Sequence, residues 1–284
     1  MGQEQSRRQF LQIAAVSAAS LIGASNCGGQ APQLQEKNEK KKELKLGLAS
    51  YSLRKFKLDE ALAMTKQVGL KYIALKSDHL PLDSTPAEIE EAAAKVRQAG
   101  LELYGGGVIY MKNETQVNQA FDYAKAAGMK IIIGVPDPDL LPLVNEKVQQ
   151  YDIKVAVHNH GPTDKNYPTP EVAYEKIKSL DSRIGLCNDI GHTMRAAVDP
   201  SVSAEKFADR LLDVHIKDVT EATKDGKAIE VGRGVIDIPK FLRTLLKIEY
   251  SGVVSFEYEK DAESPLTGLA ESVGYVRGVL AGIT

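Results

Sequence analysis

The sequence has no tryptophan, and aromatic residues make up only 6% of its 284 residues. Its two cysteines, Cys27 and Cys187, are too few and too differently placed to predict a disulfide framework. An excess of one charge is also absent: the formal net charge is −2, which offers no electrostatic footprint for nucleic acid or for an anionic membrane. What is present is an ordinary globular composition, with 43% hydrophobic residues, that permits a large core.

The N-terminal region has an apolar stretch at residues 13–24 that is too short to span a bilayer as a stable helix. It follows the motif SRRQFL at residues 6–11, an order that resembles a twin-arginine export signal. The alternative is a basic N-terminal segment of a cytosolic protein. We predict that residues 1–30 are an export signal and that the mature protein is periplasmic.

Cys27 follows this apolar stretch and precedes two glycines, so it is a candidate for lipidation and membrane anchoring. The residues before it, 24–26, form a poor lipoprotein cleavage box, and plain cleavage nearby remains the alternative. Residues 31–43 are polar and rich in lysine and glutamate, which predicts a tether. The folded domain is expected at residues 44–284.

From residue 44 onward, strand-like and helix-like segments alternate. Strands are predicted at residues 46–53, 72–75, 101–104, 130–135, 153–161, 184–189, 212–217 and 253–258. Helices are predicted at residues 58–68, 86–99, 114–127, 140–150, 170–180, 204–210, 238–248 and 268–281. Eight uninterrupted β-α units favour a single closed (β/α)8 TIM barrel of the α/β class. The rival is an open doubly wound sheet, but SYSLRKF after the first strand offers no glycine-rich phosphate loop.

Polar side chains that can bind metals end the last four predicted strands. HNH places His158 and His160 on one side of an extended strand, and later strands end in DIGH (189–192), HIKD (215–218) and EYE (257–259). Taken singly, each has an ordinary explanation: a helix cap, a buried histidine, a surface charge. In a parallel barrel all these strand ends open on one face, and burying such groups together is costly unless they pair or bind a cation. The mixed nitrogen and oxygen set suits Zn²⁺, Mn²⁺, Co²⁺ or Fe²⁺.

NDIGH, HIKD and the segment 232–259 (GRGVIDIPKFLRTLLKIEYSGVVSFEYE) resemble the xylose isomerase-like TIM-barrel family of sugar and sugar phosphate isomerases and epimerases. The resemblance implies one divalent metal ion, whether Mn, Zn, Co, Fe or Mg, held by residues from strands five to eight. By motif these include Asp189, His215 and Glu257, and His160, His192 and Lys217 are expected to bind substrate. The resemblance also implies the reaction: a base removes the proton α to a sugar carbonyl, and the reaction proceeds through a metal-bound enediolate.

The sequence departs from the family at strand five. Many relatives read ENH where this chain has His158, Asn159 and His160, so His158 takes the place of a glutamate. An imidazole can still bind a divalent metal, which makes His158 the predicted fourth ligand. The pair of glutamates needed for two-base epimerisation is lost, however. Either Glu257 acts alone or another base is recruited; Lys76 and His79, after the second strand, are the candidates, with an ordinary polar loop as the alternative.

The sequence therefore predicts a metal-dependent sugar isomerase or epimerase with a small-molecule sugar or keto-sugar substrate. A 3-keto-glycoside lyase or hydratase using the same proton abstraction is the first alternative. Two alternatives belong to other classes. One is a non-catalytic sugar-binding lipoprotein, and the other is an endonuclease IV-like DNA repair enzyme, against which the acidic charge balance counts. The oligomeric state is left open.

Overall fold

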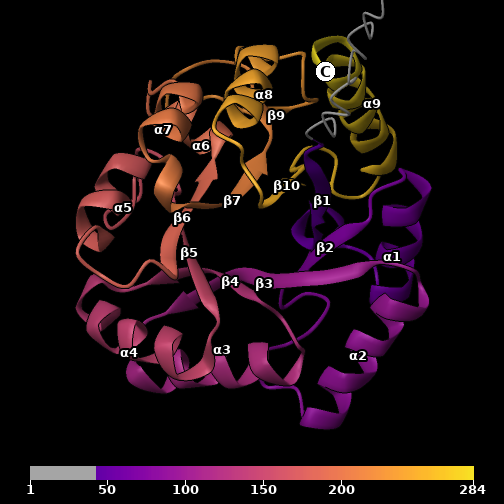
Figure 1. Ribbon diagram of the computed structural model, residues 1–284. Coiled ribbons are helices and arrows are strands. Elements are labelled where there is room, and N and C mark those ends of the chain that lie inside the picture. Colours follow the sequence, from indigo (N-terminus) through magenta and orange to yellow (C-terminus); the bar gives the residue numbers. More distant parts are fainter. Residues whose placement is uncertain (1–42) are drawn as a thin grey trace, which may run out of the picture. The chain divides into compact units, whose positions relative to one another are not determined.

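The computed structural model describes residues 43–284, in which eight parallel strands close into a barrel surrounded by helices (Figure 1). The barrel strands are β1 (Lys45–Ala49), β2 (Tyr72–Leu75), β3 (Glu102–Met111), β4 (Ile131–Pro136), β5 (Lys154–His158), β6 (Ile184–Asp189), β7 (Leu211–Ile216) and β10 (Val253–Phe256). Each pairs with its neighbour in chain order, and β10 pairs with β1 to complete the circle. The predicted single (β/α)8 barrel is confirmed.

The helices cover the outside of the barrel. They are α1 (Leu58–Gln67), α2 (Pro86–Gln98), α3 (Glu114–Ala126), α4 (Leu141–Tyr151), α5 (Pro170–Ile177), α6 (Ile190–Arg195), α7 (Pro200–Lys206), α8 (Ile238–Lys247) and α9 (Leu266–Ile283). Local sequence explains where they begin: α2 starts at a capping box of Thr85 and Glu88, with Pro86 in the first turn. Packing holds them: α8 buries Phe241, Leu242 and Leu245, and each such side chain contributes about 1.5–3 kcal/mol.

The first strand is shorter than the sequence predicts. The prediction of a strand over residues 46–53 is wrong beyond Ala49, because residues Ser50–Leu53 form a 3-10 helix. Here serine side chains, in place of strand pairing, form hydrogen bonds to the backbone of neighbouring segments. Ser50 Oγ accepts from the Lys76 amide, and Ser52 Oγ donates to the carbonyl oxygen of Phe256. The chain is thereby turned across the end of the barrel where the site lies.

The third strand is longer than predicted and runs from Glu102 to Met111. The glycines at positions 105–107 lie inside it rather than after it. A Cβ atom on Gly107 would lie 2.3 Å from the carbonyl oxygen of Ile133, so close approach of β3 to β4 requires glycine there. The register shifts between Gly107 and Ile109, and Tyr110 then pairs with Val135 near the end of β4. This extension places Tyr110 at the carboxyl end of the barrel.

The connections after β6 and β7 also differ from prediction. The helix predicted at residues 204–210 has other bounds: α7 begins at Pro200, capped by the Asp199 carboxylate, and ends at Lys206, and Ala208–Arg210 form a separate 3-10 helix. The sequence did not predict α6, which follows β6 directly. The polar segment after β7 contains a small antiparallel pair, β8 (Asp218–Val219) and β9 (Ala228–Ile229). Asp218 organises this segment, because its carboxylate accepts hydrogen bonds from the amides of Val219, Gly232, Gly234 and Ile236.

The predicted export signal, Cys27 and the tether up to residue 42 lie outside the described residues and stay predictions. Within residues 43–284, no helix has the length and apolar character needed to cross a membrane.

Candidate metal centre at the carboxyl ends of the strands

Four side chains from consecutive strand ends meet in the centre of the barrel. His158 ends β5, Asp189 ends β6, His215 lies in β7, and Glu257 follows β10. One donor atom from each lies within 4.8 Å of the other three, and all four residues are buried. His158 Nε2 is 3.2 Å from His215 Nδ1 and 3.3 Å from Asp189 Oδ2, while His215 Nδ1 is 3.3 Å from Glu257 Oε2. The structure thus brings together all four predicted ligands; their role stays a prediction.

This cluster fits a divalent cation. Two imidazole nitrogens and two carboxylate oxygens form a donor set typical of Zn²⁺, Mn²⁺, Co²⁺ or Fe²⁺. Asp189 Oδ2 is fully buried, and its neighbours are the Lys217 ammonium at 2.9 Å and His158 Nε2 at 3.3 Å, neither of them in hydrogen-bond geometry. A buried carboxylate oxygen without a well-aligned donor is incompletely satisfied, and a bound cation would satisfy it.

Lys217 lies beside the cluster as a buried counter-charge. Its Nζ is 2.6 Å from Glu257 Oε2, 2.9 Å from Asp189 Oδ2 and 2.7 Å from Glu259 Oε1. The sequence predicted a substrate-binding lysine, whereas here its ammonium is committed to three carboxylates, two of which are predicted metal ligands.

The electrostatics of the centre follow from burial and this ion pairing. Burial raises the pKa values of Asp189 and Glu257, but the Lys217 ammonium and the neighbouring histidines outweigh it and hold both pKa values well below their usual range. Burial lowers the pKa of Lys217, but the surrounding carboxylates outweigh it and raise that pKa well above its usual value. For His158, burial and then His160 lower the pKa well below 6.5, so the ring is neutral. A neutral imidazole is the form that binds metals.

A second layer lies behind His215. Its Nε2 is buried without a hydrogen-bond partner and lies 3.5 Å from Asp213 Oδ2. That carboxylate also accepts from the Cys187 thiol at 3.3 Å. Burial, then the charge of Asp213, raises the pKa of Cys187 well above its usual value, so the thiol stays protonated. Asp213 therefore lies where an orienting partner of a metal-bound histidine is expected.

The rim of the site carries two further histidines. His160 Nε2 lies 3.1 Å from the Tyr110 hydroxyl, and the two rings stack with their centroids 5.6 Å apart. The second is His192, whose ring centroid lies 5.6 Å from that of His160 and 5.9 Å from that of His158. Its Nδ1 is 3.4 Å from an Arg195 nitrogen. The predicted substrate-side histidines thus border the candidate metal cluster.

The residues predicted after the second strand are placed differently. Both ring nitrogens of His79 contact the connection between β1 and α1. Nδ1 lies 3.0 Å from Ser50 Oγ, and Nε2 lies 3.2 Å from the carbonyl oxygen of Leu53. These contacts favour a structural role for His79 over the predicted acid-base role. Lys76 Nζ donates to the Val108 carbonyl oxygen at 3.3 Å and lies 5.0 Å from the centre of the Tyr51 ring. Its contacts are with the rim and not with the four-residue cluster.

Sequence reasoning missed Tyr110 and Asp213. Tyr110 lay beyond the predicted end of the third strand, although the run VIYM after the glycines is typical of a continuing strand. Asp213 lies two residues before His215 in β7, and this alternation was the available signal that both point into the barrel.

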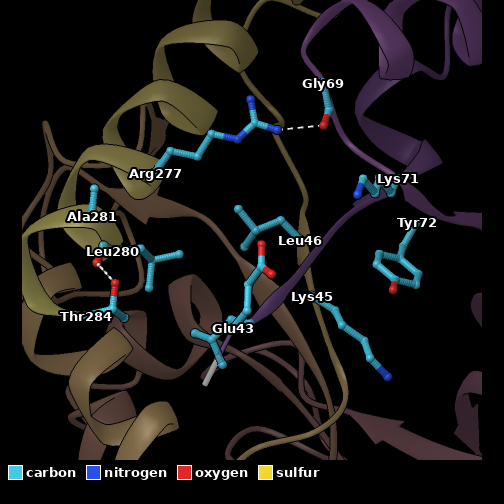
Figure 2. Close-up of a pocket in the computed structure, with 11 residues that line it drawn as sticks. Glu43, Lys45, Leu46, Gly69, Lys71, Tyr72, Arg277, Leu280, Ala281 and Thr284 are labelled. Atoms are coloured by element: carbon cyan, nitrogen blue, oxygen red, sulfur yellow. Dashed lines mark hydrogen bonds between the residues drawn. The ribbon is translucent and has the colours of Figure 1, made fainter. Parts of the chain in front are cut away.

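A cavity of about 690 Å³ lies at the other end of the barrel, away from these side chains. It is bordered by the starts of β1 and β2 and by the end of α9, where Arg277 donates to the Gly69 carbonyl oxygen at 2.6 Å (Figure 2). Active sites of this barrel type are built at the carboxyl ends of the strands, so this cavity is not the expected site of chemistry.

The closed (β/α)8 barrel, with its four-residue cluster at the ends of β5, β6, β7 and β10, is the frame for the comparison with known proteins. The Xylose isomerase-like TIM barrel family model matches residues 62–279, and the chain belongs to that family.

Individual relatives are more distant. The Rhizopine catabolism protein MocC of Rhizobium meliloti is 28% identical over 139 residues, which is 43% of this chain and 42% of that protein. The match therefore spans less than half the length of that relative. The IOLI protein, solved with a binding zinc atom, is 19% identical with a TM-score of 0.70 over 84% of this chain and 99% of that one. The apo form of 3-keto-D-glucoside 4-epimerase from E. coli is 16% identical with a TM-score of 0.66 over 83% and 100%. At these identities the two structures show the shared fold.

Proposed function

We propose that this protein is a divalent-metal-dependent enzyme of the sugar isomerase and epimerase type, which removes a proton α to the carbonyl of a keto sugar. The observation that carries the proposal is the buried cluster of two imidazoles and two carboxylates at the mouth of the barrel. The zinc-containing IOLI structure and the 3-keto-glucoside epimerase, both similar in fold, support a metal and a keto-sugar substrate.

The proposed roles follow from the contacts. A divalent cation held by His158, Asp189, His215 and Glu257 would act as a Lewis acid toward substrate oxygens. Glu257 is the proton acceptor, and because Lys217 and His215 engage its Oε2, the proton goes to Oε1. His160 and His192 at the rim bind sugar hydroxyls through their ring nitrogens.

Glu257 is ionised before it accepts the proton. Although burial raises its pKa, the Lys217 ammonium and His215 outweigh burial and hold that pKa well below its usual range. An ionised carboxylate is the form that can accept a proton. The proposed substrate class, a sugar whose reacting carbon adjoins a carbonyl, suits this acceptor because a carbonyl makes the neighbouring carbon-bound proton acidic.

A second outcome is favoured by the imidazole at the end of β5. His158 occupies the strand end where relatives carry a glutamate, and its Nε2 faces the cluster. One acceptor, Glu257, is then available for the proton at carbon, which suits elimination better than proton return on the opposite face. We propose 3-keto-glycoside lysis, with proton loss at C2 and loss of the C1 substituent, as this outcome. An exported enzyme, as residues 1–30 predict, would meet glycosides more readily than sugar phosphates.

The test is proton NMR of a 3-keto-glucoside and of simple ketoses incubated with the protein in D₂O, with added Mn²⁺ or Zn²⁺. Epimer formation supports the isomerase, and deuterium at C2 with release of the aglycone supports the lyase. If no substrate exchanges a proton in the presence of either metal, the proposed proton abstraction is wrong in both forms.

The alternatives from other classes predict different results. A non-catalytic sugar-binding protein binds metal and sugar and turns over none of these compounds. A DNA repair enzyme related to endonuclease IV binds abasic DNA tightly, whereas the formal charge of −2 gives no expectation of such binding.

A further inference from the structure

A chain of aromatic rings leads from the metal cluster to the exposed rim. The rings of His158 and His160 have centroids 4.4 Å apart, with 3.5 Å between their Nδ1 atoms. On its other side, His160 Nε2 lies 3.1 Å from the hydroxyl of Tyr110. Tyr110 is 47% exposed, whereas His158 is 1% exposed. Two contacts thus connect a buried predicted ligand to a solvent-facing phenol.

The direction of these hydrogen bonds depends on what His158 binds. Its Nε2 faces the cluster, so a cation held there takes the lone pair of Nε2 and the neutral ring carries its hydrogen on Nδ1. That hydrogen points at His160 Nδ1, which then accepts. His160 carries its own hydrogen on Nε2 and donates it to the Tyr110 oxygen.

Asp164 favours the opposite direction. Its Oδ2 lies 3.5 Å from His160 Nδ1 and would hold a hydrogen on that atom, leaving His160 Nε2 to accept from the Tyr110 hydroxyl. The His160 ring therefore has two arrangements, and Tyr110 is a free donor in only one of them. A carboxylate at position 158 has no N–H group and can only accept, so it would favour a hydrogen on His160 Nδ1, the same arrangement that Asp164 favours.

We propose that Tyr110 is a catalytic proton donor to a substrate oxygen, and that coordination of His158 turns its hydroxyl outward through His160. This inference rests on the proposed function and assigns the general acid of the proposed reaction. In the lyase outcome, the C1–O bond breaks and its electron pair goes to the leaving oxygen. The proton of the Tyr110 hydroxyl forms the new O–H bond, and the exposed phenolate regains a proton from solvent.

The first test needs no turnover. Nitrogen-15 NMR of the histidine rings is recorded on the whole protein without metal and with Zn²⁺, with His160→Gln used to assign the His160 signals. With Zn²⁺ we expect His160 to be protonated at Nε2 and unprotonated at Nδ1. The same spectrum of H158E is expected to lose this preference. A Zn²⁺-loaded ring protonated at Nδ1, or an H158E ring identical to the wild type, overturns the proposed coupling.

The second test separates chemistry from structure. Tyr110→Phe is expected to lower kcat by about 10²–10⁴-fold, the usual contribution of a positioned acid, with a smaller change in KM and unchanged Zn²⁺ affinity. Tyr275→Phe is the matched control, because Tyr275 is also exposed but lies on α9. A kcat within about twofold of the wild type, or a rise in KM alone, overturns the role of Tyr110. If the wild type itself turns over no keto sugar, the proposed function fails, while the ring-nitrogen result still stands.

Discussion

His158 uses its two ring nitrogens in different directions, with Nε2 toward Asp189 and His215 and Nδ1 toward His160. A glutamate at this position would add a third negative charge beside those of Asp189 and Glu257. The imidazole instead keeps the cluster at two carboxylates, which one lysine, Lys217, already contacts. The substitution therefore changes both the net charge of the centre and the number of available bases.

Replacing His158 with alanine is expected to lower metal affinity. Loss of a direct ligand should cost more than the roughly 10–100-fold that loss of an outer-shell partner costs. Isothermal titration with Zn²⁺ and metal analysis after dialysis measure the effect. His192→Ala is the control, since this histidine lies in the same ring cluster but outside the predicted ligand set, and its metal affinity should not change. Equal losses in the two variants would move His158 out of the ligand set.

Lys217→Met is expected to lower the stability of the metal-free protein and to raise its affinity for the metal. Without metal, Asp189 and Glu257 lose their buried counter-charge, and breaking such a pair costs about 3–5 kcal/mol. With metal, a cation that competes for the same oxygens has been removed, so affinity should rise. Urea unfolding of the metal-free protein and Zn²⁺ titration give the two readings. Weaker metal binding would show that Lys217 supports the site instead of competing for it.

At the level of elements, the segment between β7 and α8 is held by two carboxylates, those of Asp218 and Glu230. Asp218 accepts four backbone hydrogen bonds, and Glu230 accepts from Tyr258 and Lys260 farther along. Because Lys217 directly precedes Asp218, the order of this segment also fixes the counter-charge of the candidate metal cluster.

Asp218→Asn is expected to destabilise the protein by about 1–3 kcal/mol, because an amide NH₂ would face backbone N–H donors in a buried position. Asp237→Asn is a matched control in the same connection: Asp237 caps α8 through the Lys240 amide, and asparagine caps helices about as well as aspartate. Thermal unfolding compares them, and equal melting temperatures for the two variants would contradict the role given to Asp218.

How far the sequence predicted this structure also depends on individual elements. The alternation of strands and helices predicted the barrel, and strand-end position predicted the meeting of His158, Asp189, His215 and Glu257. Failures came where tertiary contacts override local pattern. Serine hydrogen bonds end β1 early, and close packing of glycines against β4 carries β3 on to Tyr110. The partners of His79 and the position of Lys217 depend on side-chain geometry, which no sequence pattern contains.

At the scale of the whole molecule, the histidines dominate the response to mild acid. All five lie at or near the carboxyl end of the barrel, and four have lowered pKa values: His79, His158, His160 and His192. Burial is the largest cause in each. His215 is the exception, because Glu257, Asp213 and Asp189 outweigh burial and raise its pKa.

The sign of the pH dependence follows from these directions. A histidine with a lowered folded-state pKa binds more protons when unfolded, so its stabilising contribution is present above about pH 6.5 and is lost as the pH falls below that value. His215 acts oppositely, since its contribution is present below that pH and is lost as the pH rises through its raised pKa. Four groups against one predict that the metal-free protein loses stability from about pH 7 to pH 5. Asp189 and Glu257, with lowered pKa values, add a further loss below about pH 4.5.

Urea unfolding of the metal-free protein at pH 7.5, 6.0 and 5.0 measures this dependence, with stability expected to fall at each step. Saturating Zn²⁺ should steepen the fall, because protons compete with the cation for His158 and His215 and the stabilisation by the bound ion disappears in acid. His79→Gln should flatten the metal-free curve without altering the zinc-dependent part, since His79 contacts Ser50 and Leu53 and not the cluster. A metal-free protein equally stable at all three pH values would contradict the lowered histidine pKa values, whereas a zinc effect independent of pH would contradict histidine ligation.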